Sequence, residues 1–198
     1  MFEDLLQTKR LIKSYYYYPK LVLVINIAEY LYSKGRDVCI FNFDKIKWEY
    51  YPYNLNFHMK CNERSENIIF EAEDESEIPN NFSLVTSIKK LNLGIPQSEI
   101  QKLDQNLFKI NIDNKIYLFR IIEGKIVEEK IKGLSEEIIN ILREYNELSL
   151  KEIVDILYHK TNSSRDNIRK EIYFLKDIGV IEIKNGKVLL NNNSWLKR

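Results

Sequence analysis

The side chains best suited to chemistry in this chain are carboxylates gathered in one stretch. Between Glu63 and Glu77 there are seven acids and one arginine, a net charge of −6. A pair of acid–base catalysts needs two carboxylates in unlike surroundings, and a solvated run of like charges does not provide them. A magnesium-dependent nuclease core can be drawn from Asp44, Glu71 and Glu73, since carboxylates that end adjacent strands hold Mg²⁺. Because no lysine accompanies them at a set spacing, we assign no catalytic residue and expect a solvated face.

Metal and cofactor motifs are equally sparse. His58 and Cys61 have the spacing of half a zinc site, but only His159 and Cys39 remain as further nitrogen or sulfur donors, and structural zinc takes four ligands. The chain has no GxGxxG, no phosphate-cradling GxxxxGK and no GxSxG. We therefore predict no metal, no cofactor and no enzymatic activity.

Basic residues gather at the other end of the sequence. The chain has 30 Lys plus Arg against 29 Asp plus Glu, so it carries no global basic signal. From His159 to the end, however, nine basic residues face four acids, a net charge of +5. Four side chains in this segment, Arg165, Arg169, Tyr173 and Lys176, follow one another at intervals of four, four and three, which places them on one side of a helix. Such a stripe is suited to phosphate and base edges.

The elements that would position this stripe are three helices and a hairpin. Acids in the first turn, Glu136 and Glu137, favour a helix from Ser135 to about Asn146. Ser149 with Glu152 forms the pattern of a capping box that starts a second helix. Ser163 or Ser164 caps a third helix. Its buried side is predicted from apolar residues at intervals of four, three and three: Ile168, Ile172, Leu175 and Ile178.

The end of this segment has the pattern of a two-strand ribbon. Gly179 ends the third helix. Two apolar runs, 180–184 and 187–190, then flank the pair Asn185-Gly186, which fits a type I′ turn.

The residues SLKEIVDILYHKTNSSRDNIRKEIYFLKDIGVIEIKNGKVLL, in this order of elements, resemble the winged-helix superfamily. That resemblance implies a third helix in the major groove of duplex DNA and a hairpin wing on the backbone. The resemblance also implies a regulator of transcription or an accessory factor in DNA transactions. The predicted DNA contacts are Ser163, Ser164, Arg165, Asn167, Arg169, Tyr173, Lys176, Lys184 and Lys187.

A second resemblance leads to a different partner. Three strands predicted over 108–131, followed by three helices, look like the peptide-recognition winged helix typified by the chaperone of pyrroloquinoline quinone assembly. That likeness implies a leader peptide added as a strand to the edge 125–131 and packed against the third helix. The implied contacts are Ile126, Glu128, Lys130, Ile172 and Tyr173. A non-catalytic subunit of a protein complex is a third interpretation, because fold alone does not select a partner.

The pattern of apolar residues in the first half of the chain predicts a mixed α/β domain of unassigned role. We expect helices over 2–13 and 20–33, and strands over 38–43, 45–53 and 67–72. A strand or short helix over 82–93 and a short helix from Ser98 to Leu103 follow. Four consecutive tyrosines, Tyr15 to Tyr18, could stack on single-stranded nucleic acid, but packing on the core is the favoured interpretation.

The fold class is therefore α+β: an N-terminal mixed α/β domain over 1–104, an antiparallel meander over 105–133 that links the two parts, and a C-terminal winged helix over 134–198. The two cysteines lie in unrelated contexts and suggest no disulfide, and the longest apolar run is too short to span a bilayer. We expect a cytoplasmic protein with no membrane partner, and a homodimer is compatible with DNA binding.

Overall fold

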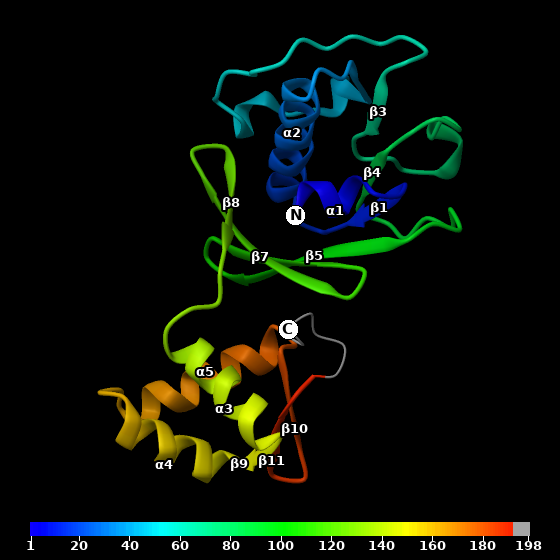
Figure 1. Cartoon of the computed structure of the whole chain (residues 1–198). Helices are drawn as coiled ribbons and strands as arrows, with labels where there is room; N and C mark the ends of the chain where they lie inside the picture. The colour runs from blue at the N-terminus through cyan, green and yellow to red at the C-terminus, as the bar shows by residue number, and fades with distance from the viewer. Residues whose placement is uncertain (192–198) are drawn as a thin grey trace. The chain divides into compact units, whose positions relative to one another are not determined.

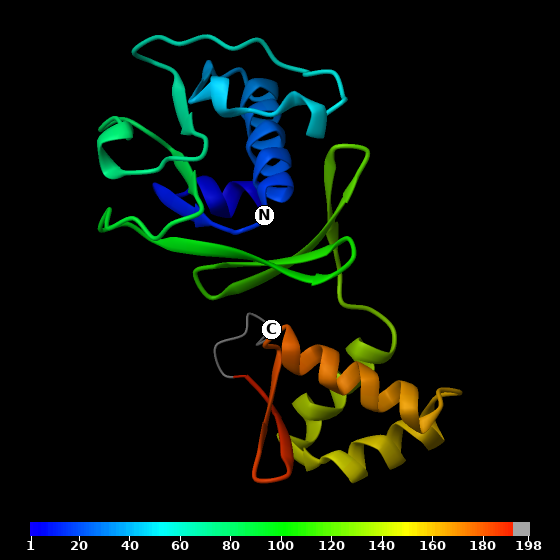
Figure 2. The ribbon, with the colours of Figure 1, turned by 180° about the vertical axis from the view of Figure 1, so that it is seen from behind.

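The computed structural model describes residues 1–191 (Figures 1 and 2). The chain forms two compact units. The N-terminal unit comprises residues 1–113 and 117–129, and the C-terminal unit comprises Asn114–Ile116 with the chain from Lys130 onward. In the described part of the chain, no helix is both long and apolar enough to cross a membrane. The protein is α+β, as the sequence predicts.

The N-terminal unit is built on one eight-stranded sheet. Its strands follow the order β2-β3-β4-β1-β5-β6-β7-β8. Their bounds are β1 Arg10–Lys13, β2 Val38–Phe41, β3 Glu66–Ile69, β4 Leu84–Ser87, β5 Gln97–Asp104, β6 Leu107–Ile112, β7 Lys115–Ile122 and β8 Lys125–Glu129. Two helices accompany them, α1 Phe2–Leu6 and α2 Tyr17–Ser33.

The first five strands of this sheet are parallel to one another. β1 pairs in parallel with β4 and with β5, and β3 pairs in parallel with β2 and with β4. All of β4, the first three residues of β1 and Ile68 and Ile69 of β3 are buried, as is usual for parallel strands that are covered on both faces. Helix α2 packs on one face through a continuous buried run, Leu21 to Ala28, which joins a single core with the strands. The carboxyl ends of these strands therefore meet at one edge of the sheet.

Three of the predicted N-terminal elements are wrong. The stretch 45–53 is not a strand: it holds two short 3₁₀ turns, Phe43–Lys45 and Trp48–Tyr50. Ser98 caps no helix, because it lies in β5. The helix predicted over 2–13 stops at Leu6, and Arg10 to Lys13 form a central strand with all but the last residue buried. Pairing with distant strands decided two of these conformations over the local pattern, because Arg10 to Lys13 lie between β4 and β5 and Ser98 lies opposite Ile12 of β1.

The predicted meander is present and belongs to the N-terminal sheet. β5 pairs antiparallel with β6, and β7 pairs antiparallel with β8. Because β5 also pairs with β1, these strands continue the parallel sheet. The boundary between the two units falls after Glu129.

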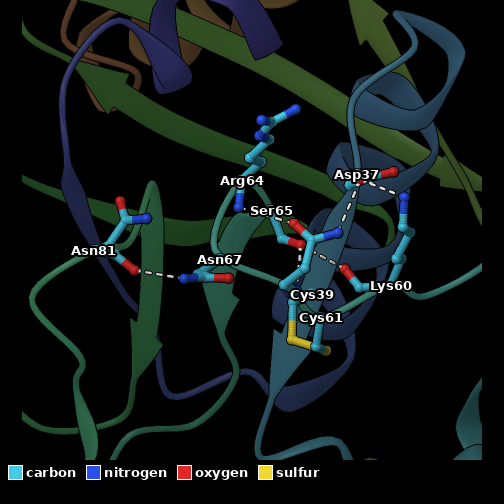
Figure 3. The surroundings of a disulfide bond; sticks show 9 residues. Asp37, Cys39, Lys60, Cys61, Arg64, Ser65, Asn67 and Asn81 are labelled. Atoms are coloured by element: carbon cyan, nitrogen blue, oxygen red, sulfur yellow. Dashed lines mark hydrogen bonds and ion pairs between the residues drawn. A yellow bond between two sulfur atoms is a disulfide. The ribbon is translucent and has the colours of Figure 1, made fainter.

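The prediction that the cysteines form no disulfide is wrong. Cys39 of β2 and Cys61 are joined, with Cα atoms 4.8 Å apart (Figure 3). The segment around Cys61 returns alongside β2, where Lys60 donates its backbone N–H to the carbonyl of Val38 at 2.9 Å and its Nζ pairs with Asp37 at 2.8 Å. The disulfide thus fastens the 42–61 loop to the outer strand of the sheet.

The C-terminal unit consists of three helices and a small antiparallel sheet. The helices are α3 Leu134–Tyr145, α4 Leu150–Lys160 and α5 Arg165–Asp177, and the strands are β9 Glu147–Ser149, β10 Ile181–Lys184 and β11 Lys187–Leu190. The strand order is β10-β11-β9, with both pairings antiparallel. The predicted three helices and hairpin are therefore confirmed, and β9 adds a third strand that the sequence did not reveal.

Local signals in this unit act as predicted. Ser149 accepts a hydrogen bond from the N–H of Glu152, whose carboxylate accepts from the N–H of Ser149, so the capping box is complete. Asn185 and Gly186 both have positive φ, as a type I′ turn requires. Asn191 follows β11 and donates its backbone N–H to Val180, which closes the base of the hairpin.

Candidate nucleic-acid interface

Helix α5 is divided into a buried side and an exposed side. Ile168, Ile172 and Leu175 are completely buried. The four predicted stripe residues, Arg165, Arg169, Tyr173 and Lys176, are all exposed. The helix thus packs through its isoleucines and leaves its guanidinium groups at the surface of its own unit.

The start of α5 is held by hydroxyl groups. Ser164 is the N-cap and accepts a hydrogen bond from the N–H of Asn167 at 3.3 Å. Ser163 donates its backbone N–H to the hydroxyl of Thr161 at 3.2 Å. The Ser164 oxygen is therefore occupied by the helix itself, and the side chain of Asn167 lies exposed one turn above it.

Arg165 is held by two side chains of α4. Its guanidinium forms an ion pair with Asp155 and lies over the ring of Tyr158, 4.5 Å from the ring centroid. The hydrogen bond from Arg165 holds the pKa of the Asp155 carboxyl below its usual value. Arg169 pairs with Asp166 on its own helix at 3.0 Å. Both guanidinium groups therefore have acidic neighbours that any anionic ligand would have to displace.

The cations of the hairpin are paired in the same way. Lys184 forms an ion pair with Glu182, and Lys187 pairs with Glu147 of β9. The Glu147 carboxylate raises the pKa of Lys187. Among the described residues, Lys176 is the stripe cation without an ion pair. All these pairs are solvent-exposed, and exposed pairs contribute only about 0–1 kcal/mol, so phosphate groups can replace the carboxylates at small cost.

Two acids that pair with cations of this surface could not be recognised from the sequence. Asp155 meets Arg165 because α4 packs against α5, and Glu147 meets Lys187 because β9 pairs with β11. Tyr158 was missed as well, although an exposed aromatic residue one helical turn after Asp155 was a visible signal. Asp155 and Glu147 bring the net charge of this surface closer to zero than the charge of +5 for the terminal segment suggested.

The other chemistry-bearing residues are not brought together as a metal site. Glu71 is buried against Lys20, whereas Glu73 pairs with Lys45. Cys61 is in the disulfide, and the ring of His58 packs edge-on against Tyr32. Within residues 1–191 no three His, Cys, Asp or Glu side chains are placed to share a metal ion.

The predicted peptide edge is partly closed. β8 is the last strand of the sheet, but Asn26 of α2 accepts a hydrogen bond from the N–H of Ile126 at 3.0 Å and donates to the carbonyl of Gly124 at 2.8 Å. Ile172 is buried in the C-terminal unit, so it is not available to a peptide. Glu128 pairs with the N-terminal amine, and Lys130 and Tyr173 are exposed. A peptide strand would have to displace Asn26 before it could pair along β8.

No protein-family model, no curated protein and no solved structure matches this chain. The assignment of a function therefore depends on the geometry of the two units.

Proposed function

We propose that the C-terminal unit is a winged helix that binds duplex DNA, with α5 as the recognition helix and the β10–β11 hairpin as the wing. The observation that carries the proposal is the exposure of Arg165, Arg169, Tyr173 and Lys176 along one side of α5 while its isoleucines are buried. An α-helix with such a face fits the major groove, where arginine can reach guanine edges and phosphates.

The wing supplies the second contact of this arrangement. The exposed turn Asn185-Gly186 lies between Lys184 and Lys187, whose ammonium groups can move from their acidic partners to the DNA backbone. Each phosphate contact releases condensed counterions, so binding by this face is strongly salt-dependent. A homodimer that reads a two-fold site is a further prediction of this proposal, and light scattering of the protein with and without DNA tests it.

A polarisation titration with labelled duplex DNA at low salt tests the proposal. The double variant Arg165→Ala/Arg169→Ala is expected to weaken binding by about tenfold or more. Lys170→Ala is the matched control, because Lys170 is an exposed cation of the same helix that lies off the stripe. Equal affinities for wild type and the double variant would exclude this face as the binding surface.

We also propose a cytoplasmic location, where the C-terminal unit would have access to DNA. Disulfides are rare in that compartment and are often transient there, so the Cys39–Cys61 bond makes the location testable. Thiol trapping in intact cells is expected to find both cysteines reduced. A fully oxidised pair would place the protein in an oxidising compartment and would contradict the location.

A further inference from the structure

A fully buried lysine occupies the start of helix α2. Lys20 has no exposed surface, and its Nζ lies 2.6 Å from Oε1 of Glu71, which is itself nearly buried. This contact is an ion pair, and within the described residues the Nζ has no hydrogen-bond partner. Burial lowers the pKa of the Lys20 ammonium, and Glu71 opposes that effect. A buried cation that pairs with one carboxylate and whose N–H donors lack hydrogen-bond partners costs folding free energy.

The position of Lys20 in the fold is one where phosphate groups are bound in other proteins. In open α/β sheets, ligands lie at the carboxyl ends of the parallel strands. In phosphate-binding loops, a strand leads through a glycine-rich turn into a helix whose first turn carries a lysine directed at the phosphates. Here β1 leads directly to α2, Lys20 lies in the first turns of that helix, and Glu71 follows the parallel strand β3.

The segment between β1 and α2 lacks the cradle of such a loop. It consists of Ser14, Tyr15 and Tyr16, and α2 then begins with Tyr17, Tyr18 and Pro19, so no glycine allows an anion to approach the backbone. The N–H of Tyr16 already bonds the hydroxyl of Ser14 at 3.1 Å, and Pro19 has no N–H. The ring of Tyr17 packs against Phe70 and Tyr50. A nucleoside phosphate therefore does not meet the glycine-rich backbone cradle of a phosphate-binding loop here.

The backbone of Glu71 adopts a conformation that is uncommon in a residue with a side chain. Glu71 has φ +51°, a left-handed conformation that costs free energy in a residue other than glycine. Neighbouring groups hold it there: its N–H donates to the hydroxyl of Thr86 at 2.9 Å, and its carbonyl accepts from Lys45 at 3.1 Å. Ala72 is fixed to β4 by two more hydrogen bonds, to Thr86 and from Ser87.

We propose that Lys20 forms an internal oxyanion site, in which the Glu71 carboxylate holds the position that a phosphate group takes in phosphate-binding α/β domains. The wild-type unit then folds without any nucleoside phosphate. Removal of the Glu71 carboxylate leaves Lys20 ready to bind a free oxyanion such as inorganic phosphate. Because 11% of the Glu71 side chain is exposed, the vacated space opens to solvent.

Thermal unfolding of four full-length proteins tests this site: wild type, Glu71→Ala, Lys20→Met and the Lys20→Met/Glu71→Ala double variant. Glu71→Ala is expected to melt lower than wild type, and inorganic phosphate is expected to raise its Tm by about 4 °C or more relative to sodium chloride at equal ionic strength. Wild type and the double variant are expected to show no such phosphate effect. Magnesium ATP is likewise expected to leave the Tm of wild type unchanged.

The outcomes are distinct. The proposed oxyanion site is overturned if phosphate raises the Tm of the double variant as much as that of Glu71→Ala. It is also overturned if phosphate or magnesium ATP shifts the Tm of wild type. If Glu71→Ala does not fold in chloride, recovery of folded protein in phosphate supports the site, and failure to recover overturns it. The double variant, which has no unpaired buried charge, is expected to be more stable than Glu71→Ala in chloride, and the reverse order contradicts the proposed pairing.

Discussion

The carboxamide of Asn26 substitutes for a neighbouring strand at Ile126. Its oxygen accepts the N–H of Ile126 and its nitrogen donates to the carbonyl of Gly124, so helix α2 satisfies the outward-facing backbone groups at the start of β8. Exposed strand edges invite pairing with other chains, and covering them with a helix is one way to prevent it. The end of the sheet is therefore protected where a peptide was predicted to add.

Asn26→Ala is expected to destabilise the N-terminal unit by about 2 kcal/mol, because the N–H of Ile126 loses its partner and the carbonyl of Gly124 keeps only the longer hydrogen bond from Tyr51. Denaturant unfolding gives the free energy, and hydrogen exchange at Ile126 is expected to become faster. Asn111→Ala is the control, since Asn111 is exposed on β6. Similar losses in both variants would show that the Asn26 amide has no special role.

Asp155→Asn is expected to strengthen DNA binding about two- to fivefold, because Arg165 loses its acidic partner while the ring of Tyr158 remains to hold it. Polarisation titration measures the change. Glu136→Gln, which removes an exposed acid from the first turn of α3, is expected to have a smaller effect. A weaker complex with Asp155→Asn would mean that Asp155 positions Arg165 for binding.

The Cys39→Ser/Cys61→Ser variant is expected to lose about 3 kcal/mol of stability, since the disulfide closes a loop between residues 22 positions apart. Urea unfolding with and without a reductant provides the measurement. Reduced wild type should match the variant. Faster hydrogen exchange is expected between residues 58 and 62 and not in α2.

Acid pH is expected to loosen the same segment. Hydrogen bonds from Lys60 and Asn62 hold the pKa of Asp37 below its usual value (Figure 3). A lowered native pKa means that the stabilisation is complete above the unfolded pKa of about 3.9 and is lost as pH falls through the native value. The Tm of wild type should therefore fall more steeply below pH 4 than that of Asp37→Asn. Parallel curves for the two proteins would contradict this linkage.

The sequence predicted the C-terminal unit well because its signals are local. Ser149 with Glu152, the Asn185-Gly186 pair and the spacing of Ile168, Ile172 and Leu175 each specify structure within a few residues. The N-terminal unit depends on contacts that no local pattern shows. Arg10 to Lys13 became a strand because β4 and β5 lie on either side.

The contacts of the candidate sites that the sequence did not predict also join segments that are distant in the chain. Cys61 meets Cys39 only after the intervening loop has folded back, and Glu71 meets Lys20 across β4. Asp155, which pairs with Arg165 of α5, comes from α4, and Glu147, which pairs with Lys187 of the hairpin, comes from β9. The exposed stripe itself was predictable because helical periodicity assigns each side chain to a face.

The salt dependence of DNA affinity tests the central claim most directly. The logarithm of the dissociation constant of wild type should rise linearly with the logarithm of salt concentration, and Arg165→Ala/Arg169→Ala should lower that slope by about 2, one for each lost phosphate contact. A wild-type slope near zero, or an unchanged slope in the double variant, would contradict the assignment of α5 as the DNA-binding helix.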